Sequence, residues 1–379
     1  MQSSGYHILI LSSAHPADDV RVLGKEAVTL VNAGHRVELW GRHKQEEIYR
    51  GVAIHPLPQT NSRLRRMLYL PWWLFREAMR RDADFHHLHD SELLPMGIVL
   101  ALLGKRVIYD VHEDLPGSIL TRYWIPRPLR RLVAALAGLL EKTATMVLTG
   151  FVPATPAIAR RFPAHRRQVV QNLPRLEEFA DYTGIRMPST EEAVFAYVGV
   201  LSEPRGAIQM LDALDLSPPH YRLVIMGVVA PADLFDRMTR HRAWPRVTYL
   251  GHRPRTEVMQ LLMNAHAGLV LFHPEPNHVE AQPNKLFEYM AAGLPVIASD
   301  FPLWRDLVGG QACGRLVNPL DPAAITRAMT AIIDHPAEAA AMGTRGRAAV
   351  YERLNWSAEG VGLVRFYSQL ALEDTLPII

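Results

Sequence analysis

Residues 280–300 read EAQPNKLFEYMAAGLPVIASD and form the most informative segment of the chain. Proline disfavours helix in the residue before it and suits the first position of a helix. A helix is therefore predicted to begin at Pro283, with Glu280 in the preceding loop. Gly293 is predicted to end that helix. The apolar run 294–299 that follows is typical of a short buried strand, so the stretch indicates an α/β protein.

The start of the predicted helix carries groups that suit a phosphorylated and hydroxylated ligand. Free N–H groups and the helix dipole favour an anion there, and Lys285 adds a positive charge in the first turn. Glu280 and Glu288 offer carboxylates, which accept hydrogen bonds from the paired hydroxyls of ribose or a hexose. Gln282 and Asn284 are candidates for contacts with ligand hydroxyls or phosphates. For a bare pair of glutamates, a surface helix with solvated charges would be the simpler interpretation.

The complete stretch resembles the E-x7-E signature of the retaining GT-B glycosyltransferases of glycosyltransferase family 4, including the usual continuation EYMAxGxPVIASD. The resemblance implies that Glu280 approaches the transferred sugar as a catalytic residue and that Glu288 binds the ribose of the nucleotide. Many relatives have Gly-Phe-Gly after the first glutamate. This chain has AQPNK at residues 281–285 instead, as in the PxKxxEYMAxG branch of the family.

A second segment resembles the part of the family that binds the donor diphosphate. Residues 199–206 read GVLSEPRG and follow a predicted strand, whereas the family pattern is Gly-Arg-x4-Lys-Gly. Gly199, Arg205 and Gly206 match this pattern, and the arginine at position 205 keeps the charge of the usual lysine. Val200 replaces the usual arginine, so Lys285 is expected to supply the second cation for the diphosphate.

The first half of the chain carries a candidate catalytic histidine. Residues 109–114 read YDVHED and lie at the carboxyl end of a predicted strand, which is a favoured place for a site. The resemblance implies that His112 lies close to the acceptor and to the reacting sugar, where an imidazole can hydrogen-bond a sugar hydroxyl. A histidine in a loop is otherwise most often structural. An inverting enzyme would need a base, and Asp114 or Glu113 would be the candidates.

Two further segments are expected on the acceptor side. His89 and Asp90 end the run FHHLHD, and Asp18 and Asp19 belong to an opening similar to the HPxDxR of this branch. Capping of a helix by Asp19 is the simpler alternative. His87 and His89 share one face of a strand, but no cluster of further ligands with zinc spacing appears elsewhere in the sequence. No metal and no cofactor are therefore expected, and a UDP- or GDP-sugar is favoured as the donor substrate.

The order of predicted elements indicates two domains. Strand, helix and strand alternate from residue 6 onward in the βαβ pattern of a parallel sheet, and the pattern starts again at residue 193. The predicted organisation is an acceptor-side domain at 1–178, a polar linker at 179–192 and a donor-binding domain at 193–355. The GT-B resemblance implies two Rossmann-like domains that face a cleft, with a terminal helix in 356–379 that returns to the first domain.

Composition limits the class of protein. A chain of 379 residues exceeds the size of most single cores, and its one cysteine, Cys313, excludes an intramolecular disulfide framework. Residues 1–180 hold 24 Lys+Arg against 17 Asp+Glu, and the remainder holds 17 against 21, so the basic first half suggests an anionic partner. Residues 62–81 and 122–140 mix arginines with aromatic and apolar residues. As helices they would either bury their apolar faces or lie in a lipid interface.

These observations predict a glycosyltransferase that uses a nucleotide-diphosphate sugar and a glycan or lipid-linked acceptor. Retention of configuration and a role in bacterial surface polysaccharide or glycolipid synthesis are expected from the resemblance. The sequence shows no secretory signal and no apolar run long enough to span a membrane, so a cytoplasmic monomer or weak dimer at the inner face of the membrane is expected. The alternatives are a sugar-nucleotide epimerase and an inactive scaffold of the same fold. A nicotinamide dehydrogenase would need a G-x-G-x-x-G loop, and a nucleic-acid binder a recognised module; neither is found.

Overall fold

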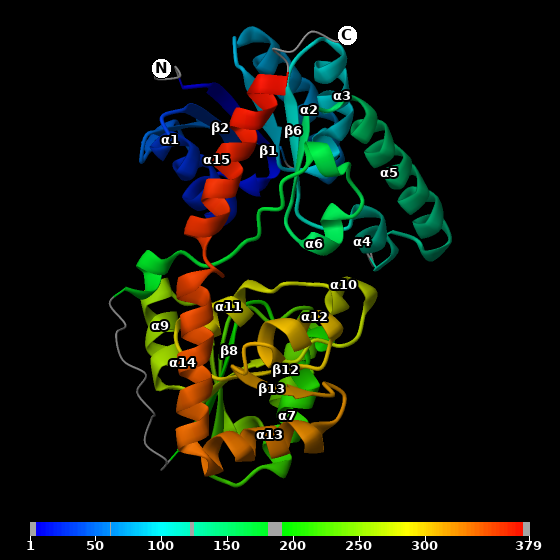
Figure 1. Ribbon diagram of the computed structural model, residues 1–379. Coiled ribbons are helices and arrows are strands. Elements are labelled where there is room, and N and C mark those ends of the chain that lie inside the picture. Colours follow the sequence, from blue (N-terminus) through cyan, green and yellow to red (C-terminus); the bar gives the residue numbers. More distant parts are fainter. Residues whose placement is uncertain (1–4, 61, 122–124, 181–191, 374–379) are drawn as a thin grey trace. The chain divides into compact units, whose positions relative to one another are not determined.

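The computed structural model describes residues 5–60, 62–121, 125–180 and 192–373 (Figure 1). The chain forms two compact units. Met1–Asn172 together with Trp356–Ile379 makes the first unit, and Leu173–Asn355 makes the second. The division therefore falls at residue 172 rather than at 178, and most of the predicted linker lies outside the described residues.

The first unit is built on a seven-stranded sheet with the strand order β3-β4-β2-β1-β5-β6-β7. All neighbouring strands are parallel except β3 and β4. The strands are β1 (His7–Pro16), β2 (Arg36–Arg42), β3 (Glu47–Tyr49), β4 (Val52–Pro56), β5 (Phe85–Leu88), β6 (Val107–Val111) and β7 (Gly150–Pro153).

Helices cover both faces of this sheet (Figure 1). They are the π-type segment η1 (Val20–Ala27), α1 (Val28–Asn32), α2 (Arg63–Arg80), α3 (Leu94–Leu102), α4 (Leu115–Thr121), α5 (Arg127–Val147), α6 (Pro156–Ala159) and α15 (Trp356–Glu373). Successive residues of a strand point to opposite faces, so Ile8 and Ile10 pack with α1 and α15, whereas Leu9 and Leu11 pack with α2 and α3. The terminal helix α15 is thus part of the core of the first unit.

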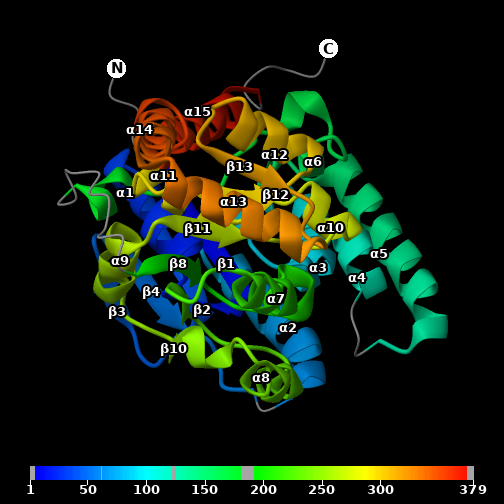
Figure 2. The same ribbon diagram turned by 90° about the horizontal axis from the view of Figure 1, so that it is seen from below.

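The second unit contains a six-stranded, entirely parallel sheet with the order β10-β9-β8-β11-β12-β13. Its strands are β8 (Ala193–Val198), β9 (Tyr221–Met226), β10 (Val247–Gly251), β11 (Ala267–Val270), β12 (Val296–Ser299) and β13 (Gly314–Val317). Its helices are α7 (Ala207–Leu216), α8 (Ala232–Thr239), α9 (Arg255–Asn264), α10 (Pro276–Val279), α11 (Asn284–Ala291), α12 (Pro302–Trp304), α13 (Pro322–Asp334) and α14 (Pro336–Glu352). In Figure 2 these helices lie on both sides of the sheet.

The predicted helix–strand pair at 280–300 is present as α11 and β12. The helix begins one residue later than expected, at Asn284, because Pro283 has extended backbone angles and occupies the position before the helix. Gly293 follows the helix with a φ of 74°, a conformation that favours glycine. Strand β8 lies between β9 and β11, so the strand order reverses there. Ligands of open parallel sheets bind at the carboxyl ends of the strands beside such a reversal.

Candidate functional site

Lys285 lies at the start of α11, and its side chain is buried with 8% of its surface exposed. Its Nζ atom has no hydrogen-bond partner among the described residues and lies 3.5 Å from the centre of the Tyr197 ring. Burial and the nearby charge of Arg205 lower the pKa of Lys285 well below its usual range. A buried amine without a partner is costly to the fold, so this geometry indicates a place for an anion.

Arg205 approaches the same place from the loop after β8. Its guanidinium donates a hydrogen bond to the carbonyl of Val200 at 2.8 Å and lies 5.6 Å from the centre of the Phe272 ring, while Nζ of Lys285 lies 5.9 Å from that ring. No carboxylate lies within ion-pair distance of Arg205 in the described parts of the chain. Two basic side chains are therefore brought together, and neither has an ion-pair partner among the described residues.

Two predicted glycines shape the backbone beside these cations. Gly206 has a φ of 83°, and a Cβ atom there would lie 2.4 Å from the carbonyl oxygen of Leu271. Gly199 has a φ of 102°, and its Cβ would stand 3.6 Å from Nζ of Lys285. Both positions therefore require glycine, the first for the close approach of β8 and β11 loops and the second for its left-handed backbone.

Glu288 lies one turn further along α11 and is about one-fifth exposed. Its Oε1 atom forms an ion pair of 2.9 Å with the guanidinium of Arg255, the first residue of α9. Arg255 also lies 3.1 Å from Oε2 of Glu178. Sequence reasoning missed Arg255, because nothing in the local pattern HRPRTE distinguishes it from a solvated surface arginine.

The other predicted residues of this site surround the start of α11. Glu280 is exposed and directly follows α10, in the loop where it was predicted. Trp304 holds that loop by donating its indole N–H to the carbonyl of Ala281 at 2.8 Å. Gln282 is half-buried, and its side-chain oxygen has no hydrogen-bond partner among the described residues, whereas Asn284 is exposed.

In the first unit, Asp90 organises the irregular carboxyl-terminal part of β1. Its Oδ2 atom accepts hydrogen bonds from the hydroxyl of Ser12 and the backbone amides of Ser13 and Ala14 at 2.7–3.0 Å. Its Oδ1 atom lies 2.8 Å from Nδ1 of His15. Both oxygens of Asp90 thus hold this end of β1, and the carboxylate raises the pKa of His15 through this contact.

Asp18 and Asp19 have different roles in the structure. The side chain of Asp19 accepts hydrogen bonds from the amides of Arg21 and Val22 at 2.8 and 3.0 Å, which is the capping role considered above as the alternative. Asp18 is exposed beside it.

His112 lies at the carboxyl end of β6 with a quarter of its side chain exposed. Its Nε2 atom is 3.3 Å from Oδ1 of Asp110 and 3.4 Å from Nδ1 of the buried His89. Burial outweighs the charge of Asp110 and lowers the pKa of His112, so the ring is neutral at pH 7. The His15 ring stacks on it with centroids 5.0 Å apart. His15 was missed, although its place near the carboxyl end of the first strand was a usable signal. Asp114, the candidate base of an inverting enzyme, is ion-paired with Arg161.

A group of four buried side chains behind His112 has the composition of a metal site. Single ligand atoms of Glu26, His87, His89 and Asp110 all lie within 4.8 Å of one another. The sequence shows no further ligands for the two histidines, but the fold brings Glu26 and Asp110 to them. However, the guanidinium of Arg21 lies 2.9 Å from carboxylate oxygens of both Glu26 and Asp110. A cation therefore already occupies the place between the two acids.

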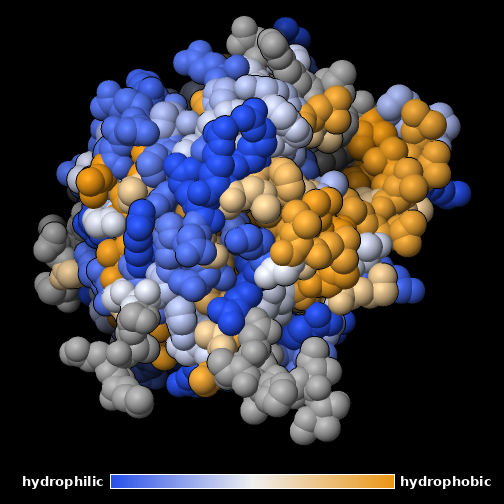
Figure 3. Space-filling view, turned by 90° about the horizontal axis from the view of Figure 1, so that it is seen from above, coloured by the Kyte–Doolittle hydropathy of each residue, from blue (hydrophilic) through white to orange (hydrophobic). Residues whose placement is uncertain are grey.

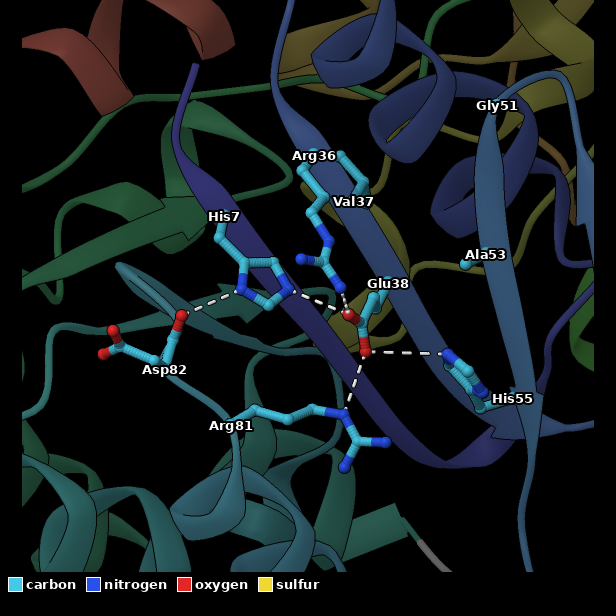
Figure 4. Close-up of a pocket in the computed structure, with 9 residues that line it drawn as sticks. All are labelled: His7, Arg36, Val37, Glu38, Gly51, Ala53, His55, Arg81 and Asp82. Carbon is cyan, nitrogen blue, oxygen red and sulfur yellow. Dashed lines mark hydrogen bonds and ion pairs between the residues drawn. The ribbon is translucent and has the colours of Figure 1, made fainter. Parts of the chain in front are cut away.

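A hollow of about 650 Å³ opens at the amino ends of β1 and β2, where Figure 4 shows His7, Arg36, His55 and Arg81 around Glu38. The Glu38 carboxylate lies 3.0 Å from Nε2 of His7, 2.8 Å from Arg36 and 3.0 Å from Arg81. Burial alone would raise the pKa of Glu38, but the hydrogen bond from His7 and the charge of Arg81 lower it. The cations of this hollow thus have an internal partner, unlike Lys285.

The chain is similar to known glycosyltransferases. The model of the family described as "Glycosyl transferases group 1" matches residues 185–349. A glycogen synthase of Mycobacterium tuberculosis is 23% identical over 97% of this chain and 87% of its own length. A GDP-mannose-dependent alpha-mannosyltransferase of the same organism is 27% identical over 73% of this chain and 72% of its own.

Solved structures share the fold over nearly the whole chain. Sucrose-phosphate synthase from Thermosynechococcus elongatus has a TM-score of 0.78 at 20% identity and covers 97% of this chain and 99% of its own. The Anabaena protein HepE, solved in complex with UDP-glucose, has a TM-score of 0.71 at 16% identity, with 95% of this chain and 98% of that chain covered. The structural similarity extends over both sheets of this chain. The chain is a glycosyltransferase with the GT-B fold, and its second unit carries the group 1 glycosyl transferase domain.

Proposed function

We propose that this protein transfers a sugar from a nucleotide-diphosphate sugar to a glycan or lipid-linked acceptor, with retention of configuration. The observation that carries the proposal is the buried Nζ atom of Lys285, which has no hydrogen-bond partner among the described residues and lies beside Arg205 at the start of α11. A diphosphate would satisfy both cations and the free amides of the helix start.

The chemistry follows from where charge develops. When the bond between the sugar and the donor phosphate breaks, negative charge accumulates on the leaving diphosphate. Lys285 and Arg205 are already in place to stabilise that charge, so little reorganisation accompanies the reaction. Because these side chains supply positive charge, we propose that transfer proceeds without a divalent metal. Glu280 is assigned to the transferred sugar and Glu288 to the ribose, with Gln282 and Asn284 beside them.

His112 is proposed to act on the acceptor side. Because its pKa is lowered, the neutral ring can both accept and donate a hydrogen bond at pH 7. It is exposed enough to reach a sugar hydroxyl, while Asp110 fixes its orientation from the buried side. No protein nucleophile is needed, and the donor phosphate is a suitable base for the acceptor hydroxyl in a retaining reaction.

A UDP- or GDP-sugar is proposed as the donor. One relative acts on GDP-mannose by its name, and one structural neighbour was solved with UDP-glucose. The direct test is a thermal-shift series with UDP, GDP, ADP and their common sugar conjugates on the wild type and on Glu288→Ala. A ligand that binds only the folded protein raises the melting temperature by mass action. One nucleotide should do so in the wild type, and the variant should lose most of the effect.

Absence of any shift in the wild type would contradict the donor assignment and favour an inactive scaffold. Release of an epimerised free sugar nucleotide in the absence of acceptor would favour the epimerase. The configuration of the product, read by NMR of the anomeric proton, tests retention, and an inverted product would contradict it.

The lipid-linked acceptor is proposed from the surface of α5. Five of its apolar side chains are each about half or more exposed, and they recur every three to seven residues along one side: Leu129, Leu132, Leu136, Leu139 and Met146. Val99 and Leu102 of α3, and Leu103 directly after it, continue the exposed apolar area, which Figure 3 shows gathered on one side of the molecule. Arg127, Arg131 and Lys142 of the same helix are exposed as well. No helix in the described parts of the chain is long and apolar enough to cross a membrane.

An apolar helix face bordered by cations suits the interface of an anionic membrane, and the acceptor would then be presented there. The other amphipathic segment, residues 62–81, differs because its apolar residues are partly buried. Its helix α2 buries Leu70, Leu74 and Ala78, although Trp72 is exposed. Sedimentation with vesicles containing phosphatidylglycerol should recover the wild type but not a Leu132→Ser/Leu136→Ser/Leu139→Ser variant. Leu216→Ser, an exposed leucine of the second unit, is the matched control. Equal recovery of all three proteins, or of none, would contradict the membrane role and with it the bacterial surface glycolipid pathway.

A further inference from the structure

The ion pair between Glu288 and Arg255 points to a role for an arginine that the proposed function does not include. NH1 of Arg255 lies 2.9 Å from Oε1 of Glu288, and the guanidinium lies 5.4 Å from the centre of the Phe179 ring. NH2 of Arg255 lies 3.1 Å from Oε2 of Glu178, whose other oxygen accepts from Arg175 at 2.9 Å. The arginine is therefore held by an acid and an aromatic ring in addition to Glu288.

This contact leaves most of the accepting capacity of Glu288 open. A carboxylate has two oxygens and about four lone-pair directions. The ion pair is formed with Oε1, and Arg255 is the one cation within 4 Å of Glu288 among the described residues. About 22% of the Glu288 side chain remains exposed, so a ligand can still reach it. The two hydroxyls of a ribose need two such acceptor positions on one correctly oriented carboxylate.

We propose that Arg255 is a positioning residue for ribose recognition, holding the Glu288 carboxylate in the orientation that accepts both ribose hydroxyls. This inference rests on the proposed function, which assigns Glu288 to the ribose. A free glutamate side chain must give up rotamer freedom when it binds a ligand, and a glutamate already fixed by an arginine has lost that freedom beforehand. Arg255 thus favours nucleotide binding without touching the nucleotide.

A direct contact of Arg255 with the diphosphate is the main competing explanation. The proposed phosphate position already has two basic side chains, Lys285 and Arg205, whereas Arg255 is ion-paired with Glu288 and Glu178. The two explanations differ in one measurable respect. A residue that acts through Glu288 affects only ligands that carry the ribose hydroxyls, whereas a phosphate contact affects every nucleoside diphosphate equally.

The test is a thermodynamic cycle that combines a substitution in the protein with removal of the 2′-hydroxyl from the ribose. Dissociation constants for UDP, GDP and ADP and for their 2′-deoxy counterparts are measured by calorimetry on the wild type, Arg255→Ala, Arg255→Lys and Glu288→Ala. Arg253→Ala is the matched control, because Arg253 lies in the same loop and its ion pair, with Glu257, is on the surface. For the nucleotide that binds best, the wild type should prefer the ribo form about tenfold, as expected for a hydrogen bond to a charged group.

In Arg255→Ala this preference should fall to about twofold or less, and the 2′-deoxy form should lose less affinity than the ribo form, because it keeps only the 3′-hydroxyl for Glu288. Arg255→Lys should retain part of the preference and Arg253→Ala all of it. Circular dichroism verifies that each variant is folded. If Arg255→Ala does not fold, the inference is tested by the preference for the ribo form, which should be lower in Arg255→Lys than in Arg253→Ala.

Equal weakening of ribo and deoxy forms in Arg255→Ala would overturn the inference and leave a phosphate contact. If Glu288→Ala itself keeps the preference for ribose, the assignment of Glu288 in the proposed function is wrong, and the inference falls with it. If no nucleoside diphosphate binds the wild type, the donor site as a whole is wrong. The failure of Arg255 alone is therefore distinguishable from failure of the proposed function.

Discussion

The amine of Lys285 lies over the face of the Tyr197 ring, 3.5 Å from its centre. The negative face of an aromatic ring attracts a cation, but it replaces only part of the hydration that burial removes. The hydroxyl of Tyr197 is turned away and donates to the carbonyl of Val200 at 2.8 Å. In the absence of ligand, Lys285 is thus held in position at a cost to the stability of the second unit.

Replacement of Lys285 by methionine should therefore stabilise the protein while it abolishes nucleotide binding. Lys285→Met keeps the length of the side chain and removes the desolvated amine. We expect a gain of about 1 kcal/mol or more, or roughly 2–4 °C in melting temperature for a unit of this size. Differential scanning calorimetry without ligand measures the effect. A melting temperature lower than that of the wild type would mean that the amine has a stabilising partner in the native protein.

Binding of a nucleoside diphosphate should take up a proton at alkaline pH. The pKa of Lys285 is lowered in the free protein, and a bound diphosphate favours the charged amine, so the pKa rises on binding. The affinity should accordingly fall as pH rises above the lowered pKa. Calorimetry at pH 8.5 in two buffers of different ionisation enthalpy measures the uptake, since the phosphates, with pKa values of about 6, are already ionised there.

Lys285→Arg is the control for this measurement, because a guanidinium stays charged at all accessible pH values and should bind without uptake. Release of protons by the wild type, or equal uptake by the arginine variant, would contradict the role of Lys285.

Removal of Arg21 should destabilise the first unit strongly. Arg21 lies between Glu26 and Asp110, and all three side chains are buried. Its charge keeps the pKa of Asp110 below the usual range, although burial alone would raise it. Arg21→Met leaves a buried carboxylate without its partner, and such changes cost about 3–5 kcal/mol. Urea unfolding followed by circular dichroism measures the loss.

The matched control is Arg36→Met. Arg36 also pairs with a carboxylate, but its side chain is 72% exposed, and exposed pairs contribute about 0–1 kcal/mol. Similar losses for the two variants would mean that the buried network is not what stabilises the first unit.

Asp90→Asn should lower the pKa of His15. The raised pKa of His15 depends mainly on its hydrogen bond to Asp90, which an amide cannot replace with a negative charge. Because the folded pKa is raised, the pair stabilises the folded state at low pH, and this contribution is lost as pH rises through the raised value. NMR titration of the His15 ring measures the shift. An unchanged pKa of His15 in the variant would show that Asp90 does not raise that pKa.

The sequence predicted the parts of this structure that depend on neighbouring residues. The helix at Asn284–Ala291, the strand after it and the cap by Asp19 follow from proline, glycine and capping preferences that act over a few positions. Arg255 is 33 residues from Glu288, and such a distant pairing leaves no local pattern. The same applies to Glu26, which joins Asp110 from another element and which no spacing of histidines would reveal.

For the amphipathic segments 62–81 and 122–140, the sequence also could not predict which residues are buried. Their composition left open whether the apolar faces pack inside or lie on the surface. In α2 the period of four places Leu70 and Leu74 in the core, whereas the leucines at 132, 136 and 139 of α5 are exposed. Helical period predicts that residues share a face, but the neighbours of the helix decide which face is covered.

The grouping of Trp356–Glu373 with the first unit has a consequence for how the chain folds during synthesis. Helix α15 supplies Trp356, Leu363, Phe366, Tyr367 and Leu370 to the core around Ile8 and Ile10. Residues 173–355 are therefore an insertion within the first unit, and all of them are translated before that unit can complete its core. The first sheet is then complete but lacks helix α15 while the second unit folds, so a released chain that ends at residue 355 should display a protease-resistant second unit and a protease-sensitive first one.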